Sequence, residues 1–114
     1  MNWIPLTDPK QLSEIEALSK SRPQVIFKHS TRCSVSAVAK HRLEKAMPTE
    51  NTDFYYLDLI TYRSLSNQIA EHYSVYHESP QVLLIIQGAC VYDESHSGIQ
   101  MDDIQSQISS VAAL

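Results

Sequence analysis

Several features are scarce in this chain of 114 residues, and each scarcity excludes a class of protein. It has only two glycines while 43% of its residues are hydrophobic, so its composition is not that of a disordered chain. Nine basic residues are outnumbered by thirteen acidic ones and form no stripe, so nucleic-acid binding has no electrostatic basis. No apolar run approaches the roughly 20 residues that span a bilayer. The chain also begins without the basic start and apolar stretch of an export signal, so we expect a soluble cytoplasmic protein that binds neither nucleic acid nor membrane.

Cysteine is scarce as well, because Cys33 and Cys90 are the only two and lie far apart in the sequence. We expect no structural disulfide between them in a reducing compartment. Neither has a second cysteine at the spacing of zinc ligands, and the five histidines are dispersed, so we predict no metal site. The length suits a single domain, residues 1–114, whose core needs neither a metal nor a disulfide.

Hydrophobic spacing predicts that strands and helices alternate through the first part of the chain. In order, we expect an edge strand at 3–6, a helix opened by Asp8 and Pro9 that ends near Ser21, a strand at 24–28, a helix from Cys33 to Pro48, a strand at 54–59 and a helix at 62–73. This alternation favours right-handed parallel crossovers in an α/β sheet.

The pattern changes in the last part of the chain. Strands at 81–86 and 89–93 are separated only by a Gln-Gly pair, which allows a hairpin and excludes a parallel crossover. A final amphipathic helix starts near 101–102. We therefore predict a central mixed β-sheet of about five strands flanked by four helices, in the order β-α-β-α-β-α-β-β-α.

Apolar residues at helical spacing mark the helix faces that we expect to be buried. They are Leu12, Ile15, Ala17 and Leu18 in the first helix, Val35, Val38, Ala39, Leu43, Ala46 and Met47 in the second, Leu65, Ile69 and Tyr73 in the third, and Ile104, Ile108 and Val111 in the last. The strand at 24–28 is apolar without clean alternation, which indicates a central parallel strand covered on both faces.

The junction between the second strand and the second helix, residues 29–36, contains Cys33. The first N–H groups of a helix have no internal partner and the helix dipole is positive there, so a thiolate is favoured over a thiol. Helix N-termini and neighbouring cations lower a cysteine pKa from ~8.5 to between ~3.5 and ~7.5, and Arg32, Lys28 and His29 are close in sequence. The alternative is that Cys33 is buried and packs as a small hydrophobe.

The order of elements, with a cysteine at the first turn of the second helix and a proline directly before the penultimate strand, is similar to the thioredoxin fold. More narrowly, three separate segments resemble the monothiol bacilliredoxin family of bacterial thioredoxin-like proteins. They are Phe27-Lys28-His29-Ser30-Thr31-Arg32-Cys33-Ser34-Val35-Ser36, Glu78-Ser79-Pro80-Gln81 and Ser95-His96-Ser97-Gly98-Ile99. The resemblance implies a thioredoxin-like fold and a cytoplasmic thiol–disulfide exchange protein that removes bacillithiol from mixed disulfides on other proteins.

The resemblance also implies roles for single residues. Cys33 would be the nucleophile, and Pro80 would lie next to the active site after a cis peptide bond. The backbone of Ser79 would pair with the bound substrate chain. The other candidates for substrate contact are Thr31, Arg32, Ser34 and Ser36.

The chain departs from the family at Ser34, because the family usually carries proline directly after the cysteine. Serine leaves an additional N–H and a hydroxyl beside the sulfur. Bacillithiol is not made by every bacterium, so another low-molecular-weight thiol could be the co-substrate. The implied partners are this thiol and S-thiolated client proteins, and no cofactor would be bound permanently.

Ser36 occupies the position of the second cysteine of a dithiol oxidoreductase. A hydroxyl cannot resolve a mixed disulfide, so the route through Cys33 would be monothiol, with reduction supplied by another thiol. Alternatively, Ser36 is simply a polar residue of the first helical turn. Cys90 is a candidate for a distant resolving cysteine, although its place in a predicted strand favours packing. Lys28 and His29 either lower the pKa of the thiol or form the solvated end of a strand.

Two other classes of function stay open. One is a hydrolase that uses Cys33 with a histidine base, although His41 lies roughly 12 Å further along the same helix and no third group orients His29. The other is a non-catalytic thioredoxin-like module that binds partner proteins through the groove beside Pro80. Substituting Cys33 separates these functions, because a binding module would keep its affinity for partners.

Overall fold

The computed structural model describes residues 1–46 and 50–112 of the chain. The elements are β1 (Ile4–Pro5), α1 (Lys10–Leu18), β2 (Gln24–His29), α2 (Ser34–Lys45), β3 (Asp53–Asp58), α3 (Arg63–Tyr73), β4 (Gln81–Ile86), β5 (Ala89–Ser95), the 3-10 turn η1 (His96–Gly98) and α4 (Met101–Ala112). The predicted order of strands and helices is confirmed. Met47, expected in the second apolar stripe, and Pro48, the predicted end of that helix, lie outside the described residues.

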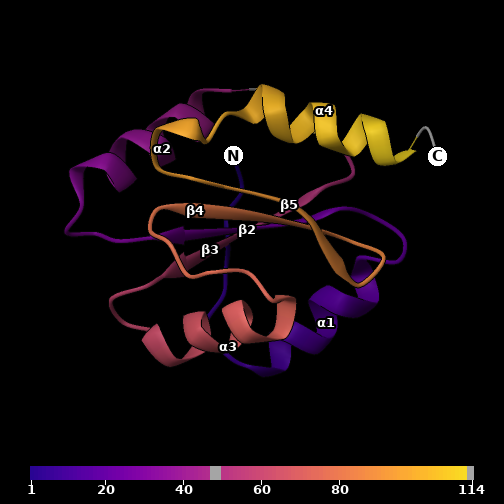
Figure 1. Cartoon of the computed structure of the whole chain (residues 1–114), viewed down its shortest axis with the longest axis horizontal. Coiled ribbons are helices and arrows are strands. Elements are labelled where there is room, and N and C mark those ends of the chain that lie inside the picture. Colours follow the sequence, from indigo (N-terminus) through magenta and orange to yellow (C-terminus); the bar gives the residue numbers. More distant parts are fainter. Residues whose placement is uncertain (47–49, 113–114) are drawn as a thin grey trace.

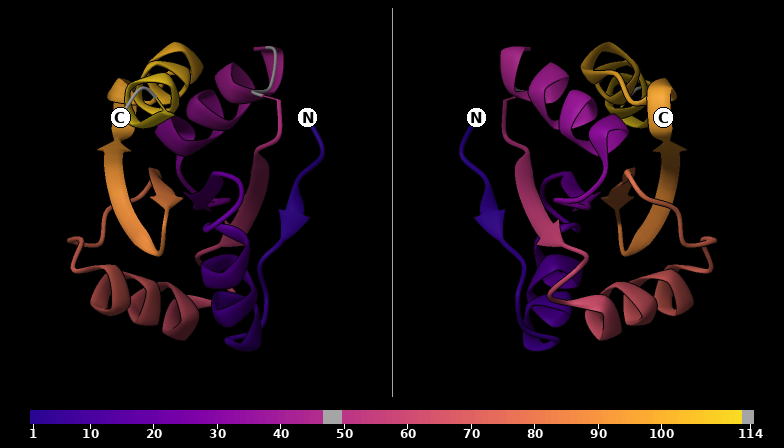
Figure 2. Two further views of the ribbon diagram at one scale, coloured as in Figure 1. Left: turned by 90° about the vertical axis from the view of Figure 1, so that its right-hand side faces the viewer. Right: turned by 90° about the vertical axis from the view of Figure 1, so that its left-hand side faces the viewer.

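The strands form one mixed sheet in the order β1-β3-β2-β4-β5, with β2 at its centre. β2 pairs in parallel with β3 and antiparallel with β4, and β4 pairs antiparallel with β5. Helices α1 and α3 cover one face of the sheet, and α2 and α4 cover the other (Figures 1 and 2). The expected parallel pairing of the central strand is therefore confirmed for β3 and wrong for β4. After α3 the segment 74–80 carries the chain back to the edge where β2 ends, so β4 must run in the opposite direction.

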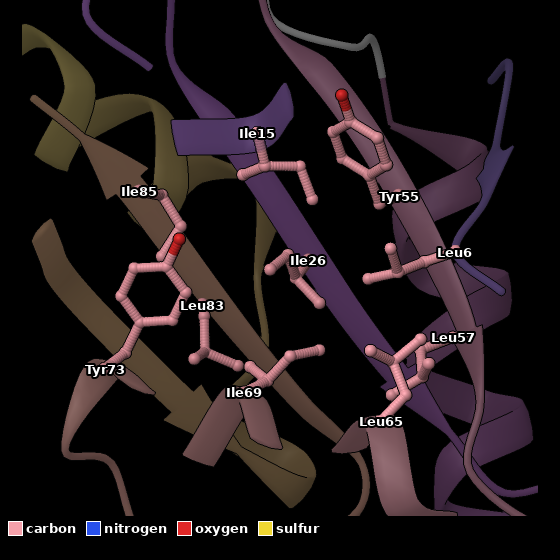
Figure 3. Close-up of a cluster of buried hydrophobic side chains, with 10 residues drawn as sticks. All are labelled: Leu6, Ile15, Ile26, Tyr55, Leu57, Leu65, Ile69, Tyr73, Leu83 and Ile85. Carbon is pink, nitrogen blue, oxygen red and sulfur yellow. The ribbon is translucent and has the colours of Figure 1, made fainter. Parts of the chain in front are cut away.

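All six residues of β2 are buried, and their alternation divides the core into two layers. The layer in Figure 3 lies between the sheet and helices α1 and α3, and consists of Leu6, Ile15, Ile26, Tyr55, Leu57, Leu65, Ile69, Tyr73, Leu83 and Ile85. The layer under α2 and α4 consists of Val25, Phe27, Ala39, Leu43, Phe54, Val82, Leu84, Ile99, Met101 and Ile104. The same alternation sends the last two residues of β2, Lys28 and His29, to opposite layers.

Some apolar residues of α1 and α2 that we expected in the core are exposed instead. They are Ala17, Leu18, Val35 and Val38. The buried residues of α2 are Ser36, Ala39 and Leu43. A polar residue therefore lies on the buried face of this helix, and the two valines are turned away from the sheet. In the described part of the chain, no helix is both long and apolar enough to cross a bilayer.

The hairpin between β4 and β5 turns at Gln87 and Gly88, as the Gln-Gly pair predicted. Their φ angles are 53° and 78°, and two successive residues with positive φ are typical of a type I′ hairpin turn. A side chain at the second position would be strained, which explains the glycine there. β5 continues to Ser95, beyond its predicted end at 93.

Candidate functional site

The turn between β2 and α2 presents Cys33 directly before the helix begins. Cys33 is the N-cap of α2, with extended backbone angles of φ −111° and ψ 120°. Its carbonyl oxygen accepts a helical hydrogen bond from the Ala37 N–H at 3.1 Å, and its own N–H donates to the Ser30 carbonyl oxygen at 3.2 Å. The thiol is free, partly exposed and makes no capping hydrogen bond. Cys33 is therefore not a buried packing residue, and it lies next to the N–H groups that the helix leaves unpaired.

Ser36, at the position of the second cysteine of a dithiol oxidoreductase, stabilises this turn from its buried side. Its side chain is fully buried. Its Oγ accepts a hydrogen bond from the Ser30 N–H at 3.0 Å and lies 2.6 Å from Nδ1 of His29. The prediction that Ser36 contacts the substrate is wrong, because the side chain has no exposed surface. Its alternative role, a polar residue of the first helical turn, is the one that the structure supports.

His29 is buried between aromatic rings and is not a solvated strand end. Its ring centroid lies 5.7 Å from that of Phe27 and 5.5 Å from that of Tyr56. Burial lowers the pKa of His29, the charge of Lys40 adds to this effect, and Asp58 opposes it. Nδ1 of the neutral ring can accept a hydrogen bond from the Ser36 hydroxyl, so the turn is held by hydrogen bonds between uncharged groups.

Lys28 is buried on the opposite face of the sheet. The alternative interpretation, that Lys28 forms the solvated end of a strand, is therefore wrong as well. Its Nζ donates to the Ser66 carbonyl oxygen on α3 at 3.1 Å and lies 3.4 Å from Nδ1 of His77. Burial lowers the pKa of Lys28 to about 8. Within the described residues neither Lys28 nor His29 hydrogen-bonds to Cys33, so their proposed effect on its thiol stays a prediction.

The pairing of β2 with β4 brings the cysteine turn and the proline to the same edge of the sheet. Lys28 is opposite Gln81, so β2 ends where β4 begins. The peptide bond between Ser79 and Pro80 is cis, as the resemblance implied, and the proline is buried. The Oγ of Ser79 is buried and has no hydrogen-bond partner among the described residues.

Gln81 holds the segment that precedes the proline. Its Nε2 donates to the Tyr76 carbonyl oxygen at 2.9 Å, and its Oε1 accepts from the Glu78 N–H at 3.4 Å. The Pro80 carbonyl oxygen accepts from the His96 N–H at 3.0 Å. Segment 76–80 is therefore held by the side chain of the first residue of β4 and by a backbone group of η1.

The remaining candidates for substrate contact flank the cysteine. Thr31, Arg32 and Ser34 are all exposed. Their side chains are available to a bound partner, and their contacts with a substrate stay predictions.

Cys90 lies far from this edge, close to the hairpin. It pairs with Ile85 near the other end of β4 and packs against the core layer under α1 and α3. Its Sγ donates to the Tyr92 carbonyl oxygen at 3.4 Å. Burial, together with the charge of Asp93, raises the pKa of Cys90 to about 11. These features favour the packing role over that of a resolving cysteine.

The described residues at this edge of the sheet support neither a cysteine–histidine hydrolase nor a metal site. In the described part of the chain, Nδ1 of His29 is engaged by Ser36 and His41 lies about two helical turns beyond Cys33, so no cysteine–histidine pair is assembled. Nor do three or more histidine, cysteine or carboxylate side chains gather there as metal ligands would.

Sequence reasoning missed Ser66, His77 and Gln81, which support the segment before the proline. A serine on a helix and a histidine in a loop carry no local signal of this kind. The one available signal was Lys28 itself, because an ammonium group within a buried strand requires polar partners.

Comparisons with known proteins place these features in one family. The family model of the monothiol bacilliredoxin BrxC matches residues 4–104. The chain is similar to a solved structure provisionally described as an oxidoreductase with a thioredoxin fold, with 28% identity, a TM-score of 0.80 and 92% of each chain covered. The thioredoxin of Malassezia sympodialis matches with a TM-score of 0.70, 15% identity and coverage of 96% of this chain and 90% of that one. The thioredoxin of Trypanosoma brucei brucei matches with a TM-score of 0.72, 11% identity and coverage of 99% and 93%. The predicted thioredoxin fold is confirmed.

The two cysteines should differ in reactivity in the folded protein. We expect iodoacetamide to modify Cys33 first, because Cys90 is half-buried and its pKa of about 11 leaves on the order of a thousandth of it as thiolate at pH 8. Peptide mass spectrometry of samples quenched over time measures both rates, and the unfolded protein in urea, where both thiols are accessible, is the control. Faster modification of Cys90 in the folded protein would contradict this assignment.

The buried amine of Lys28 should make stability depend on pH. Because its pKa is about 8 in the folded protein and 10.5 unperturbed, the unfolded chain binds more protons between these values. The contribution of Lys28 to the free energy of unfolding should therefore rise with pH, by at most about 1.4 kcal/mol per pH unit. Urea unfolding of wild type and Lys28→Met at pH 8, 9 and 10 measures this effect, since the other titrating groups cancel in the difference. A difference that does not change with pH would refute the assignment.

Proposed function

Because the chain belongs to the monothiol bacilliredoxin family, we propose that this thioredoxin-like redox protein is a monothiol exchange protein that acts on S-thiolated client proteins. The group that it removes is bacillithiol or a similar low-molecular-weight thiol, called the small thiol here. The proposal locates the protein in the reducing cytoplasm, where disulfides of this kind arise under oxidative stress. The reaction needs no permanently bound cofactor, because the small thiol is itself the reductant.

The exchange proceeds in two steps. The Cys33 thiolate attacks the small-thiol sulfur of the client's mixed disulfide, a bond forms between these two sulfurs, and the client leaves as a thiolate that is then protonated. A second molecule of small thiol, as its thiolate, attacks the small-thiol sulfur now attached to Cys33. This releases the Cys33 thiolate and a disulfide of two small thiols. Overall the client sulfur is reduced to a thiol and the second small thiol is oxidised, while the small-thiol sulfur that is transferred stays in a disulfide throughout.

The observation that carries the proposal is the side chain at the position of the second cysteine. Ser36 is buried, and its hydroxyl is used by Ser30 and His29. A hydroxyl at this position cannot attack the Cys33 disulfide, so a thiol from solution must do so. Cys90 is on β5 opposite Ile85, near the end of β4 that lies away from Pro80, so it could not substitute without a large rearrangement.

The reaction requires an anionic sulfur and a surface that binds the client chain. The start of α2 supports the first requirement, and the segment before Pro80 supports the second. Unpaired N–H groups at the start of α2 favour the anionic sulfur of Cys33. The backbone of Ser79 would pair with the client chain, and Thr31 and Arg32, which are exposed and precede Cys33 in the chain, would be available for further contacts. Ser34, in place of the family's usual proline, adds an N–H and a hydroxyl next to the sulfur.

A non-catalytic binding module is the second candidate. It is favoured by Val35 and Val38, which are 45% and 56% exposed on α2 close to the cysteine turn. Apolar side chains exposed together are typical of a surface that contacts other proteins. Such a module would bind clients equally well with or without the thiol.

Replacing each cysteine separates these functions. We expect Cys33→Ser to reduce release of the small thiol from an S-bacillithiolated client to the uncatalysed rate, whereas Cys90→Ser stays within about twofold of wild type. Release in the presence of free bacillithiol is measured by mass spectrometry of the client. Binding of the client to Cys33→Ser, measured by calorimetry, is the control for folding and recognition.

The outcomes distinguish the candidates. Release that persists in Cys33→Ser would contradict the exchange mechanism. Binding of clients by the wild-type protein without any release of the small thiol would favour the binding module.

A further inference from the structure

Lys28 is a fully buried cation that has no carboxylate partner among the described residues. Its side chain is 0% exposed, and its Nζ contacts the Ser66 carbonyl oxygen and Nδ1 of His77. Burying an ammonium group without an opposite charge destabilises a fold. A methionine would fill much of the same space without this penalty. Packing alone therefore does not explain why a lysine is at this position.

Both contacts of the ammonium group lead towards segment 76–80. The Oγ of Ser66 lies 3.3 Å from Nδ1 of His77. Lys28 and Ser66 of α3 therefore both contact the same nitrogen of this ring and hold the ring in place. The side chain of Gln81, which is opposite Lys28 in the sheet, holds the same segment through two backbone groups. The buried amine is thus one of two supports beneath the backbone that precedes the proline.

The hydrogen bonds define the state of the His77 ring. An ammonium group only donates, so Nδ1 of His77 accepts from Lys28 and the ring proton is on Nε2. Burial lowers the pKa of His77, as do the charges of Lys28 and Arg63, while Glu78 raises it. The ring is therefore a neutral acceptor fixed by a cation.

We propose that Lys28 is a positioning residue for thiol–disulfide exchange with protein clients. Its ammonium group holds His77 and, through it, segment 76–80, so that the Ser79 backbone is in place for a client chain whose disulfide reaches Cys33. The inference rests on the proposed exchange function. Among the described residues the ammonium group contacts Ser66 and His77 and makes no hydrogen bond to Cys33. We therefore expect its loss to change the recognition of a client chain more than the reactivity of the sulfur.

The variant Lys28→Met tests this role with three measurements. We expect KM for an S-thiolated client protein to rise about tenfold or more, the effect of losing one hydrogen bond to a charged group, while kcat changes little. We expect the rate of Cys33 alkylation by iodoacetamide to stay within about twofold of wild type. The urea midpoint at pH 7 should be equal to or higher than that of wild type, because a buried charge has been removed.

Further variants separate the hydrogen bond from the charge. His77→Leu removes the acceptor and should raise KM as Lys28→Met does, whereas His77→Asn keeps an acceptor oxygen and should restore much of the loss. Lys10→Met removes the same charge from the exposed first turn of α1, and we expect wild-type kinetics from this control.

Each result decides between a positioning role and a structural one. Lys28→Met with wild-type KM, or with a lowered urea midpoint and parallel losses in alkylation and exchange, would overturn the proposal, because the amine would then be dispensable or purely structural. Equal kinetics of His77→Leu and His77→Asn would also overturn it. A wild-type protein that exchanges with no client, yet alkylates at Cys33, would instead overturn the exchange function itself.

Discussion

The antiparallel pairing of β2 with β4 is the constraint on which the site depends. It sets Lys28 opposite Gln81, so the turn that carries Cys33 leaves the sheet where the chain enters it after Pro80. The pairing is fixed because all of β2 is buried between two core layers. A slip by one residue would send every side chain of the strand to the wrong face. The hydrophobic core thereby determines which two distant segments of the chain form the site.

The last two residues of β2 support the site from opposite faces of the sheet. On the α2 side, His29 and Ser36 hold the cysteine turn by short hydrogen bonds between neutral groups. On the α3 side, Lys28 and His77 hold the segment before the proline. The Cys33 sulfur and the segment before Pro80 are thus carried by short turns, each anchored to a buried strand. Such anchoring fixes the geometry of a site more tightly than a free loop would.

Local sequence patterns were sufficient for the elements and for the position of Cys33 at the start of a helix. A strand that stops just before helical spacing begins placed Cys33 at a helix start, and a turn pair between apolar runs gave the hairpin. Helical periodicity failed for α2, because it marked Val35 and Val38 as buried when Ser36 takes the buried position. The partner of that hydroxyl comes from another element, and Lys28 and His77 are 49 residues apart. Contacts of this kind depend on tertiary packing and leave no local period to detect.

Transfer of the small thiol from a client to the protein tests the central claim most directly. Reduced protein is mixed with one equivalent of S-bacillithiolated client without free bacillithiol, quenched with acid and analysed by tandem mass spectrometry. The account predicts one bacillithiol attached to Cys33, a free thiol on the client and an unmodified Cys90. Attachment to Cys90, or a client that keeps its bacillithiol while Cys33 stays free, would contradict it.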